Sequence, residues 1–216
     1  MTRICIIALC GVCAWAQQQL TRWNNPGQSP FPEPGAPFQA LPLDIPPPIP
    51  PERPSGGSIS LAQLRHRVPK EARKLFLRAA RLAKREDHAG AAKELEAAVR
   101  LDPEYAGAYE QLGIEYGELR RPSDAAVIFR RLLELSPDSV GAHCYLGMAL
   151  LQMGDRGQGE EQIRRALRLS PGDARCQFLL GYLLWQQEPT RDEGLARIHE
   201  AARTLPYAKK VLRSLQ

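Results

Sequence analysis

Hydrophobic and polar positions follow a helical period from about residue 70 to residue 206. Large apolar residues recur three or four positions apart, which places them on one face of a helix, and charged residues fill many of the positions between them. Turns rich in proline, glycine and small polar residues separate these segments. The pattern therefore predicts an all-α domain built from short amphipathic helices.

The helical pattern repeats along the chain. The prolines that close successive units are Pro103, Pro137, Pro171 and Pro206. The first three are evenly spaced, and the fourth follows after one extra residue. The glycines that recur in step within the units are Gly113, Gly147 and Gly181. A fixed period of about 34 residues indicates stacked helical hairpins, because one hairpin cannot bury its own apolar face.

In these positions the chain resembles the tetratricopeptide repeat family. The second unit matches best, at Tyr109, Leu112, Gly113, Tyr116, Ala125, Phe129 and Pro137. The third unit matches at His143, Leu146, Gly147, Leu150, Gly159, Ile163, Ala166 and Pro171. The fourth slips by one residue, so we expect an insertion near Pro189 and Thr190 to lengthen its turn.

The resemblance implies a right-handed superhelical solenoid of about four hairpins. The domain is expected over residues 70–206, with a capping helix at residues 207–216. The expected units are residues 72–105, 106–139, 140–173 and 174–206.

Residues 1–16 are typical of an export signal. An apolar run follows Arg3, and Ala14 and Ala16 are small residues where a signal peptidase needs them. We expect cleavage before Gln17 and a periplasmic, cell-envelope or secreted protein. Retention as an anchor and lipidation are the alternatives. The run is shorter than the roughly 20 apolar residues that cross a bilayer, so we expect no transmembrane span after cleavage.

Residues 17–57 are expected to be a disordered linker. Prolines crowd this segment, and each removes a backbone donor and fixes φ, which excludes regular helices and sheets. Residues 58–69 are expected to form a short helical lead-in. Ser60 and Gln63 have the spacing of a capping box at a helix start.

Candidate chemistry is sparse. Of the five cysteines, three lie in the expected signal, which leaves Cys144 and Cys176. Export would permit a bond between these two thiols, and small buried apolar residues are the simpler interpretation. His143 could join them as a metal ligand, but tetrahedral zinc sites use closer, paired spacing. We therefore expect no catalytic residue, no metal and no cofactor, and the chain is not interpreted as an enzyme.

The formal charge of +5 is too small to indicate nucleic-acid binding, and aromatic residues make up only 6% of the chain. A basic cluster at the first unit could contact an acidic partner or an anionic membrane surface. A solvated helix face is the simpler explanation. The cluster comprises Arg65, Arg67, Lys70, Arg73, Lys74, Arg78, Arg81, Lys84 and Arg85.

In the tetratricopeptide family the first helix of each unit lines a concave groove that receives a peptide or helix. The resemblance implies groove positions at Phe76, Ile114, Cys144, Met148, Leu151, Phe178, Tyr182 and Trp185. The helix that contains the last three is apolar on nearly every side, so something should cover it. The cover could be a partner, the capping helix or the segment before residue 69. Phe76 and Ala80 stand where chaperone-type members hold a partner's carboxylate, which argues against that mode of binding.

These features predict an exported, non-catalytic scaffold or adaptor that binds a protein partner. The alternatives are an accessory subunit of an envelope enzyme or assembly complex, and a structural spacer whose groove is self-filled. Neither the identity of the partner nor the oligomeric state follows from the sequence.

Overall fold

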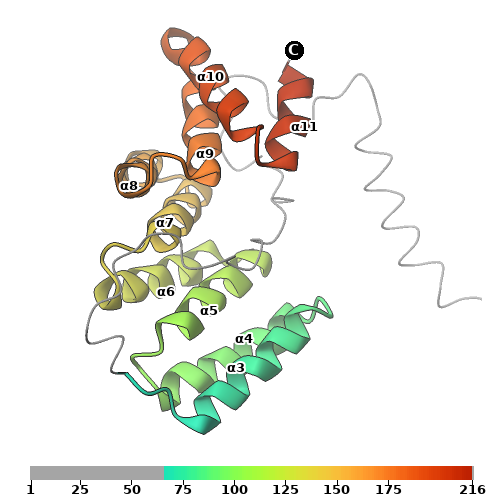
Figure 1. The fold of residues 1–216 in the computed structure, drawn as a ribbon, viewed down its shortest axis with the longest axis vertical. Coiled ribbons are helices and arrows are strands. Elements are labelled where there is room, and N and C mark those ends of the chain that lie inside the picture. Colours follow the sequence, from blue (N-terminus) through green and yellow to red (C-terminus); the bar gives the residue numbers. More distant parts are fainter. Residues whose placement is uncertain (1–65, 216) are drawn as a thin grey trace, which may run out of the picture.

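The computed structural model describes residues 66–215 (Figure 1). The expected signal at 1–16, the linker at 17–57 and most of the lead-in at 58–69 lie outside the described residues. Residues 66–69 precede the first described helix and are not helical themselves. All regular elements between residues 66 and 215 are helices, and the expected all-α solenoid of hairpins is confirmed.

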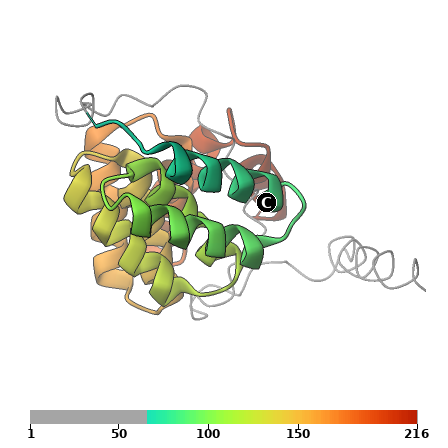
Figure 2. The ribbon, with the colours of Figure 1, turned by 90° about the horizontal axis from the view of Figure 1, so that it is seen from below.

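Four hairpins follow one another and a last helix ends the stack (Figures 1 and 2). The first helices of the hairpins are α3 Lys70–Ala83, α5 Ala106–Glu118, α7 Val140–Gln152 and α9 Ala174–Trp185. Their partners are α4 His88–Leu101, α6 Pro122–Leu135, α8 Arg156–Leu169 and α10 Arg191–Ala201. The last helix is α11, Pro206–Leu215.

The turns inside the hairpins repeat at the level of the backbone. Glu86, Arg120 and Gly154 have φ angles of 61°, 58° and 86°, and they occupy the same place in three successive units. A residue in this left-handed region commonly ends a helix, because it redirects the chain and satisfies the last carbonyl groups. The fourth hairpin has instead a short 3-10 helix, Glu188–Thr190. This departure lies where the repeat slips by one residue.

Side-chain caps fix the start of four helices. Asp87, Ser139, Asp155 and Asp173 each accept a hydrogen bond from the backbone N–H three residues later, at distances between 2.9 and 3.2 Å. These bonds satisfy amides that have no partner within the helix. The caps therefore set where α4, α7, α8 and α9 begin.

The recurring glycines allow the two helices of a hairpin to approach closely. A Cβ atom at Gly113 would lie 2.5 Å from the Phe129 ring, and one at Gly181 would lie 2.8 Å from the carbonyl oxygen of Gly194. At Gly147 it would lie 2.7 Å from Ile163. No larger residue fits at these crossings without displacing its neighbour.

The hydrophobic core consists of two clusters that meet at α7. Tyr145 and Leu150 of this helix belong to a cluster with residues of α3 to α6, whereas Cys144 and Leu151 belong to a second cluster with residues of α8 to α11. Met148 packs against both clusters. Helix α7 is therefore buried on nearly every side and joins the two halves of the stack.

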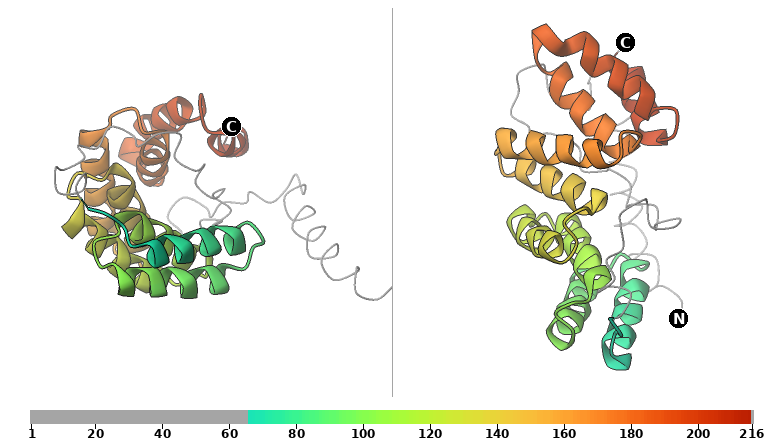
Figure 3. Two further views of the ribbon diagram at one scale, coloured as in Figure 1. Left: turned by 60° about the horizontal axis from the view of Figure 1, so that its bottom comes forward. Right: turned by 60° about the vertical axis from the view of Figure 1, so that its left-hand side comes forward.

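The stack follows a curved path, with α3 on the inner side of the arc and α4 on its outer side (Figure 3). Among residues 66–215, no helix combines the length and the apolar character that crossing a membrane requires.

Candidate functional site

The residues expected to line the groove fall into two groups. Phe76, Ile114, Met148 and Trp185 are partly exposed. Cys144, Leu151, Phe178 and Tyr182 are buried in the second cluster. The expected positions therefore do not form one accessible surface in this structure.

The last helix packs against the apolar helix α9. Tyr207 of α11 meets the edge of the Phe178 ring, with centroids 5.3 Å apart, and Val211 is buried in the same cluster. On α9 itself, the rings of Phe178 and Tyr182 stack at 6.4 Å. Burial raises the pKa of Tyr182 to about 12. These contacts agree with the alternative in which the capping helix covers this part of the groove.

Helix α3 has an exposed face at the other end of the stack. Leu77 is 51% exposed, and Phe76 is partly buried with its ring 5.4 Å from that of Tyr105. The exposed basic residues on or directly after this helix are Lys70, Arg73, Lys74, Arg78, Arg81, Lys84 and Arg85. Lys74 lies 4.0 Å from Glu71, the one acidic residue of the helix. This surface combines a large apolar side chain with a strong positive charge.

Polar groups of three first helices interact, by a hydrogen bond between α9 and α7 and electrostatically between α9 and α5. Arg175 of α9 donates a hydrogen bond to the Tyr145 hydroxyl of α7 at 2.7 Å, and its guanidinium lies 5.2 Å from the centroid of that ring. Burial raises the pKa of Glu110 on α5, and the charge of Arg175 opposes that shift. Arg175 is also 3.5 Å from Asp173. The groove side therefore contains charged groups as well as apolar ones.

The groove positions implied by the family resemblance do not include Tyr145 or Asp173. Asp173 could have been found from its place just after Pro171, because an aspartate in that position is a typical helix cap. Tyr145 gives no such signal, since its hydroxyl is recruited by a residue of the next unit.

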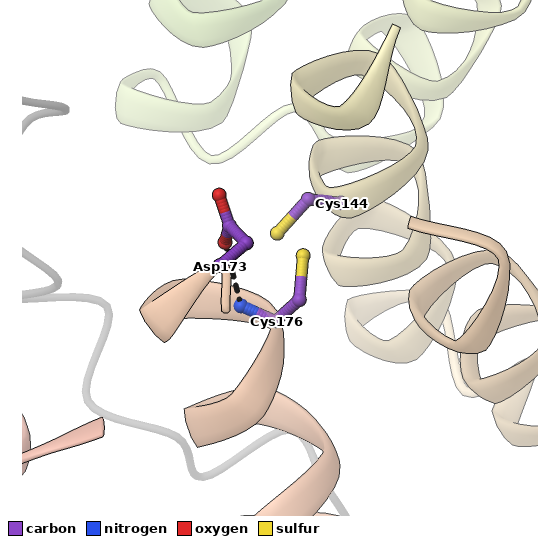
Figure 4. Close-up of side chains that lie close together, drawn as sticks. All are labelled: Cys144, Asp173 and Cys176. Carbon is purple, nitrogen blue, oxygen red and sulfur yellow. Dashed lines mark hydrogen bonds between the residues drawn. The ribbon is translucent and has the colours of Figure 1, made fainter. Parts of the chain in front are cut away.

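Cys144 and Cys176 come together across α7 and α9 (Figure 4). Their sulfur atoms and a carboxylate oxygen of Asp173 all lie within 4.8 Å of one another. Both thiols are free and buried. His143 does not join them, because its ring nitrogens lie 2.9 Å from the Pro137 carbonyl oxygen and 2.8 Å from Gln162. The sequence analysis considered His143 as a third group and set it aside, and in the structure Asp173 is the group that lies beside the two thiols.

Two other histidines pair with buried carboxylates. His66 lies 2.8 Å from Asp102, and His88 of α4 lies 2.8 Å from Glu115 of α5. Burial raises the pKa of Glu115, and its hydrogen bond with His88 acts in the opposite direction. These pairs join neighbouring segments of the first half of the stack, and they serve packing rather than an open site.

Comparison with known proteins gives one family. The family described as "Tetratricopeptide repeat" matches residues 76–140, 110–155 and 145–203. No curated protein sequence matches the chain.

Solved structures share the fold at low sequence identity. A MamA crystal structure is 20% identical, with a TM-score of 0.53 over 62% of this chain and 80% of that chain. The MamA RS-1 ArsTM double mutant is 21% identical, with a TM-score of 0.56 over 65% and 78%. The first repeat domain of Spaghetti (RPAP3), bound to the HSP90 peptide SRMEEVD, is 16% identical, with a TM-score of 0.51 over 53% and 90%.

Proposed function

Because the family matches cover more than half of the chain, this protein belongs to the tetratricopeptide repeat family, and we propose that it is a non-catalytic scaffold that binds a protein partner. The family match indicates an interaction module and names no catalytic activity. The similar RPAP3 domain was solved with a peptide bound. That likeness supports a peptide-binding role here without indicating the same peptide, since Phe76 and Ala80 occupy the positions of the carboxylate-binding residues.

The exposed face of α3 is the observation that carries this proposal. An apolar side chain that is half exposed within a basic surface suits a partner segment with an apolar anchor and acidic neighbours. Phe76 of α3 and Ile114 of α5 are also partly exposed and would extend the contact. The corresponding face of α9 supports a weaker role, because Phe178 and Tyr182 are buried and Phe178 contacts Tyr207 of α11. We therefore place the partner on the first half of the stack.

A partner can be tested without knowing its identity. A random-peptide display library would be selected against the full chain, and the enriched peptides would be measured individually. The decisive variant is Arg73→Glu with Leu77→Ser on α3. Its matched control is Arg130→Glu with Val127→Ser on α6, where Val127 is 60% exposed. Both variants change the net charge by the same amount, and each removes one exposed apolar side chain.

We expect enriched peptides to be acidic and to bind the α3 variant at least about tenfold more weakly, or about 1.4 kcal/mol. The control variant should bind as the wild type does. Affinity should fall as salt rises, because charged surfaces are screened. Equal binding to both variants, or selection that enriches no peptide, would contradict the proposal.

We also propose that the protein acts outside the cytoplasm. The support is the pattern of residues 1–16, in which Arg3 precedes an apolar run that ends at Ala16. N-terminal sequencing of the protein from the producing cells tests this location. A mature chain that begins at Gln17 supports export, and an intact N-terminus on a cytoplasmic protein contradicts it.

A structural spacer is the second candidate. The burial of Phe178 and Tyr182 and the contact of Phe178 with Tyr207 of α11 favour it, since a self-covered surface needs no partner. The library selection separates the two functions, because a spacer should enrich no peptide on α3.

A further inference from the structure

Two thiols lie beside each other in the interior of the stack. Cys144 on α7 and Cys176 on α9 are the only cysteines among residues 66–215, and both are buried in the second cluster. Their sulfur atoms are no more than 4.8 Å apart (Figure 4). They belong to the first helices of consecutive units, and the segment between them includes the whole of α8.

We propose that Cys144 and Cys176 form an intramolecular disulfide that joins the third unit to the fourth. This covalent site is independent of the proposed partner. A disulfide requires the two sulfurs to come within about 2.05 Å. The present separation calls for rotation of one side chain between staggered rotamers and a small adjustment of the helices.

The surroundings favour a disulfide over a metal ion. Asp173 would be the third ligand, but its carboxylate already accepts the Cys176 amide at 3.0 Å and lies 3.5 Å from the guanidinium of Arg175. That fixed positive charge opposes a second cation.

Thiol–disulfide exchange with a small disulfide such as oxidised glutathione would form the bond. One cysteine loses its proton, attacks the glutathione disulfide and releases one glutathione thiolate, which takes up a proton. The second cysteine then attacks the mixed disulfide and releases the other glutathione. The two protein thiols lose two protons and two electrons, and the glutathione disulfide becomes two thiols. Because both sulfurs are buried, the exchange takes place during folding or when α7 and α9 separate locally.

The bond would strengthen the second half of the core, because Cys144 of α7 and Cys176 of α9 both lie in the second cluster. Helix α7 contributes side chains to both clusters, while Cys176 lies entirely in the second. A cross-link at this point closes a long loop and restricts the unfolded chain. Oxidation should therefore stabilise the fourth unit against separation from the rest of the stack.

Peptide mapping tests the proposal on the full chain. The reduced protein would be incubated, folded, with oxidised glutathione, quenched with acid, alkylated and digested with trypsin. Cys144 and Cys176 fall on the separate tryptic peptides 132–156 and 176–191. We expect these two peptides to be recovered linked in most molecules, and the melting temperature to rise by roughly 5–10 °C on oxidation. Cys144→Ala and Cys176→Ala should each abolish the rise.

Three outcomes would overturn the proposal. Both peptides could stay alkylated after native oxidation while the denatured protein oxidises readily. They could be linked only to Cys5, Cys10 or Cys13. Alternatively, the reduced protein could bind Cd²⁺ with a thiolate charge-transfer absorption that Cys144→Ala and Cys176→Ala each remove, which would identify a metal site. The first two outcomes are read on the wild-type chain and do not depend on how well a variant folds.

Discussion

Helices α3 and α9 occupy the same position in the first and fourth units, yet they have opposite surroundings. In α3 only two of 14 residues are buried, and a basic stripe faces solvent. In α9 eight of 12 residues are buried, with α8, α10 and α11 around them. The repeat therefore determines where a helix lies in the stack. Whether that helix stays exposed to a partner depends on side chains outside the repeat positions.

The difference in burial between α3 and α9 suggests that α9 contributes mainly to the stability of the fold and α3 mainly to binding. The aromatic residues of α9 pack against one another and against Tyr207, so their removal should affect folding first. The exposed residues of α3 make few internal contacts, so their removal should affect a partner first. Four predictions test this division.

The largest effect is expected for Phe178→Ala. Truncation of a buried phenylalanine leaves a cavity and typically costs about 3–5 kcal/mol of unfolding free energy. Leu77→Ala on α3 should change stability by less than about 0.5 kcal/mol, because the side chain is already half exposed. Urea unfolding of both variants measures the contrast. If the two variants lose equal amounts of unfolding free energy, α9 does not contribute more to stability than α3, and this prediction is wrong.

Much of this division could be predicted from the sequence. Evenly spaced prolines indicated the hairpins, and the uniformly apolar composition from Cys176 to Trp185 indicated a covered helix. The identity of the cover could not be predicted. It depends on how far the superhelix turns before α11 begins, and that angle is set by many small packing contacts rather than by one motif.

The candidate site was predicted less completely. The family pattern gave the groove side of each helix, but it could not distinguish partly exposed Phe76 from buried Phe178, because both are large aromatic residues at groove positions. The approach of Asp173 to the two cysteines was also missed. It depends on the packing of α7 against α9, which brings together residues of two different units.

The next largest effect concerns the helix crossings. Gly181→Ala would place a Cβ atom 2.8 Å from a backbone carbonyl oxygen, which cannot move aside as a side chain can. Overpacking of this kind costs roughly 1–3 kcal/mol. Gly117→Ala is the matched control in α5, since no atom apart from its chain neighbours and the nearby backbone of its own helix lies within 4 Å of its Cβ position. Alanine is also the better helix former, by up to about 1 kcal/mol. Thermal unfolding should show opposite shifts, and shifts of the same sign would contradict this account of the crossings.

A smaller contrast is expected between two helix caps. Asp173→Ala should cost about 1–2 kcal/mol, because the carboxylate caps α9 and also lies beside Arg175. Asp87→Ala should cost about 1 kcal/mol or less. The hydrogen bond from the Gly90 amide to the Asp87 carboxylate is exposed, so water can replace the lost carboxylate. Urea unfolding of both variants gives the order. If Asp87→Ala loses more unfolding free energy than Asp173→Ala, the cap of α9 does not contribute more to stability than the cap of α4, and this prediction is wrong.

The smallest effect is expected at Glu110 of α5, a carboxyl whose pKa is influenced by the charge of Arg175 on α9. Burial raises the pKa of this carboxyl above its usual value of 4.5, with the positive charge of Arg175 acting against that shift. The folded protein therefore holds this proton more tightly than the unfolded chain does. The associated stability is present below the unfolded pKa and is lost as pH rises through the folded pKa.

Glu110→Gln should remove this loss, so the variant should gain stability relative to the wild type as pH rises from about 4 to about 7. Parallel urea unfolding at several pH values measures the difference. Arg175→Met is the matched comparison, because it removes the charge that favours ionised Glu110 and should steepen the wild-type loss. If Glu110→Gln keeps the wild-type dependence on pH, burial does not make ionisation of the Glu110 carboxyl unfavourable, and this account of the residue is wrong.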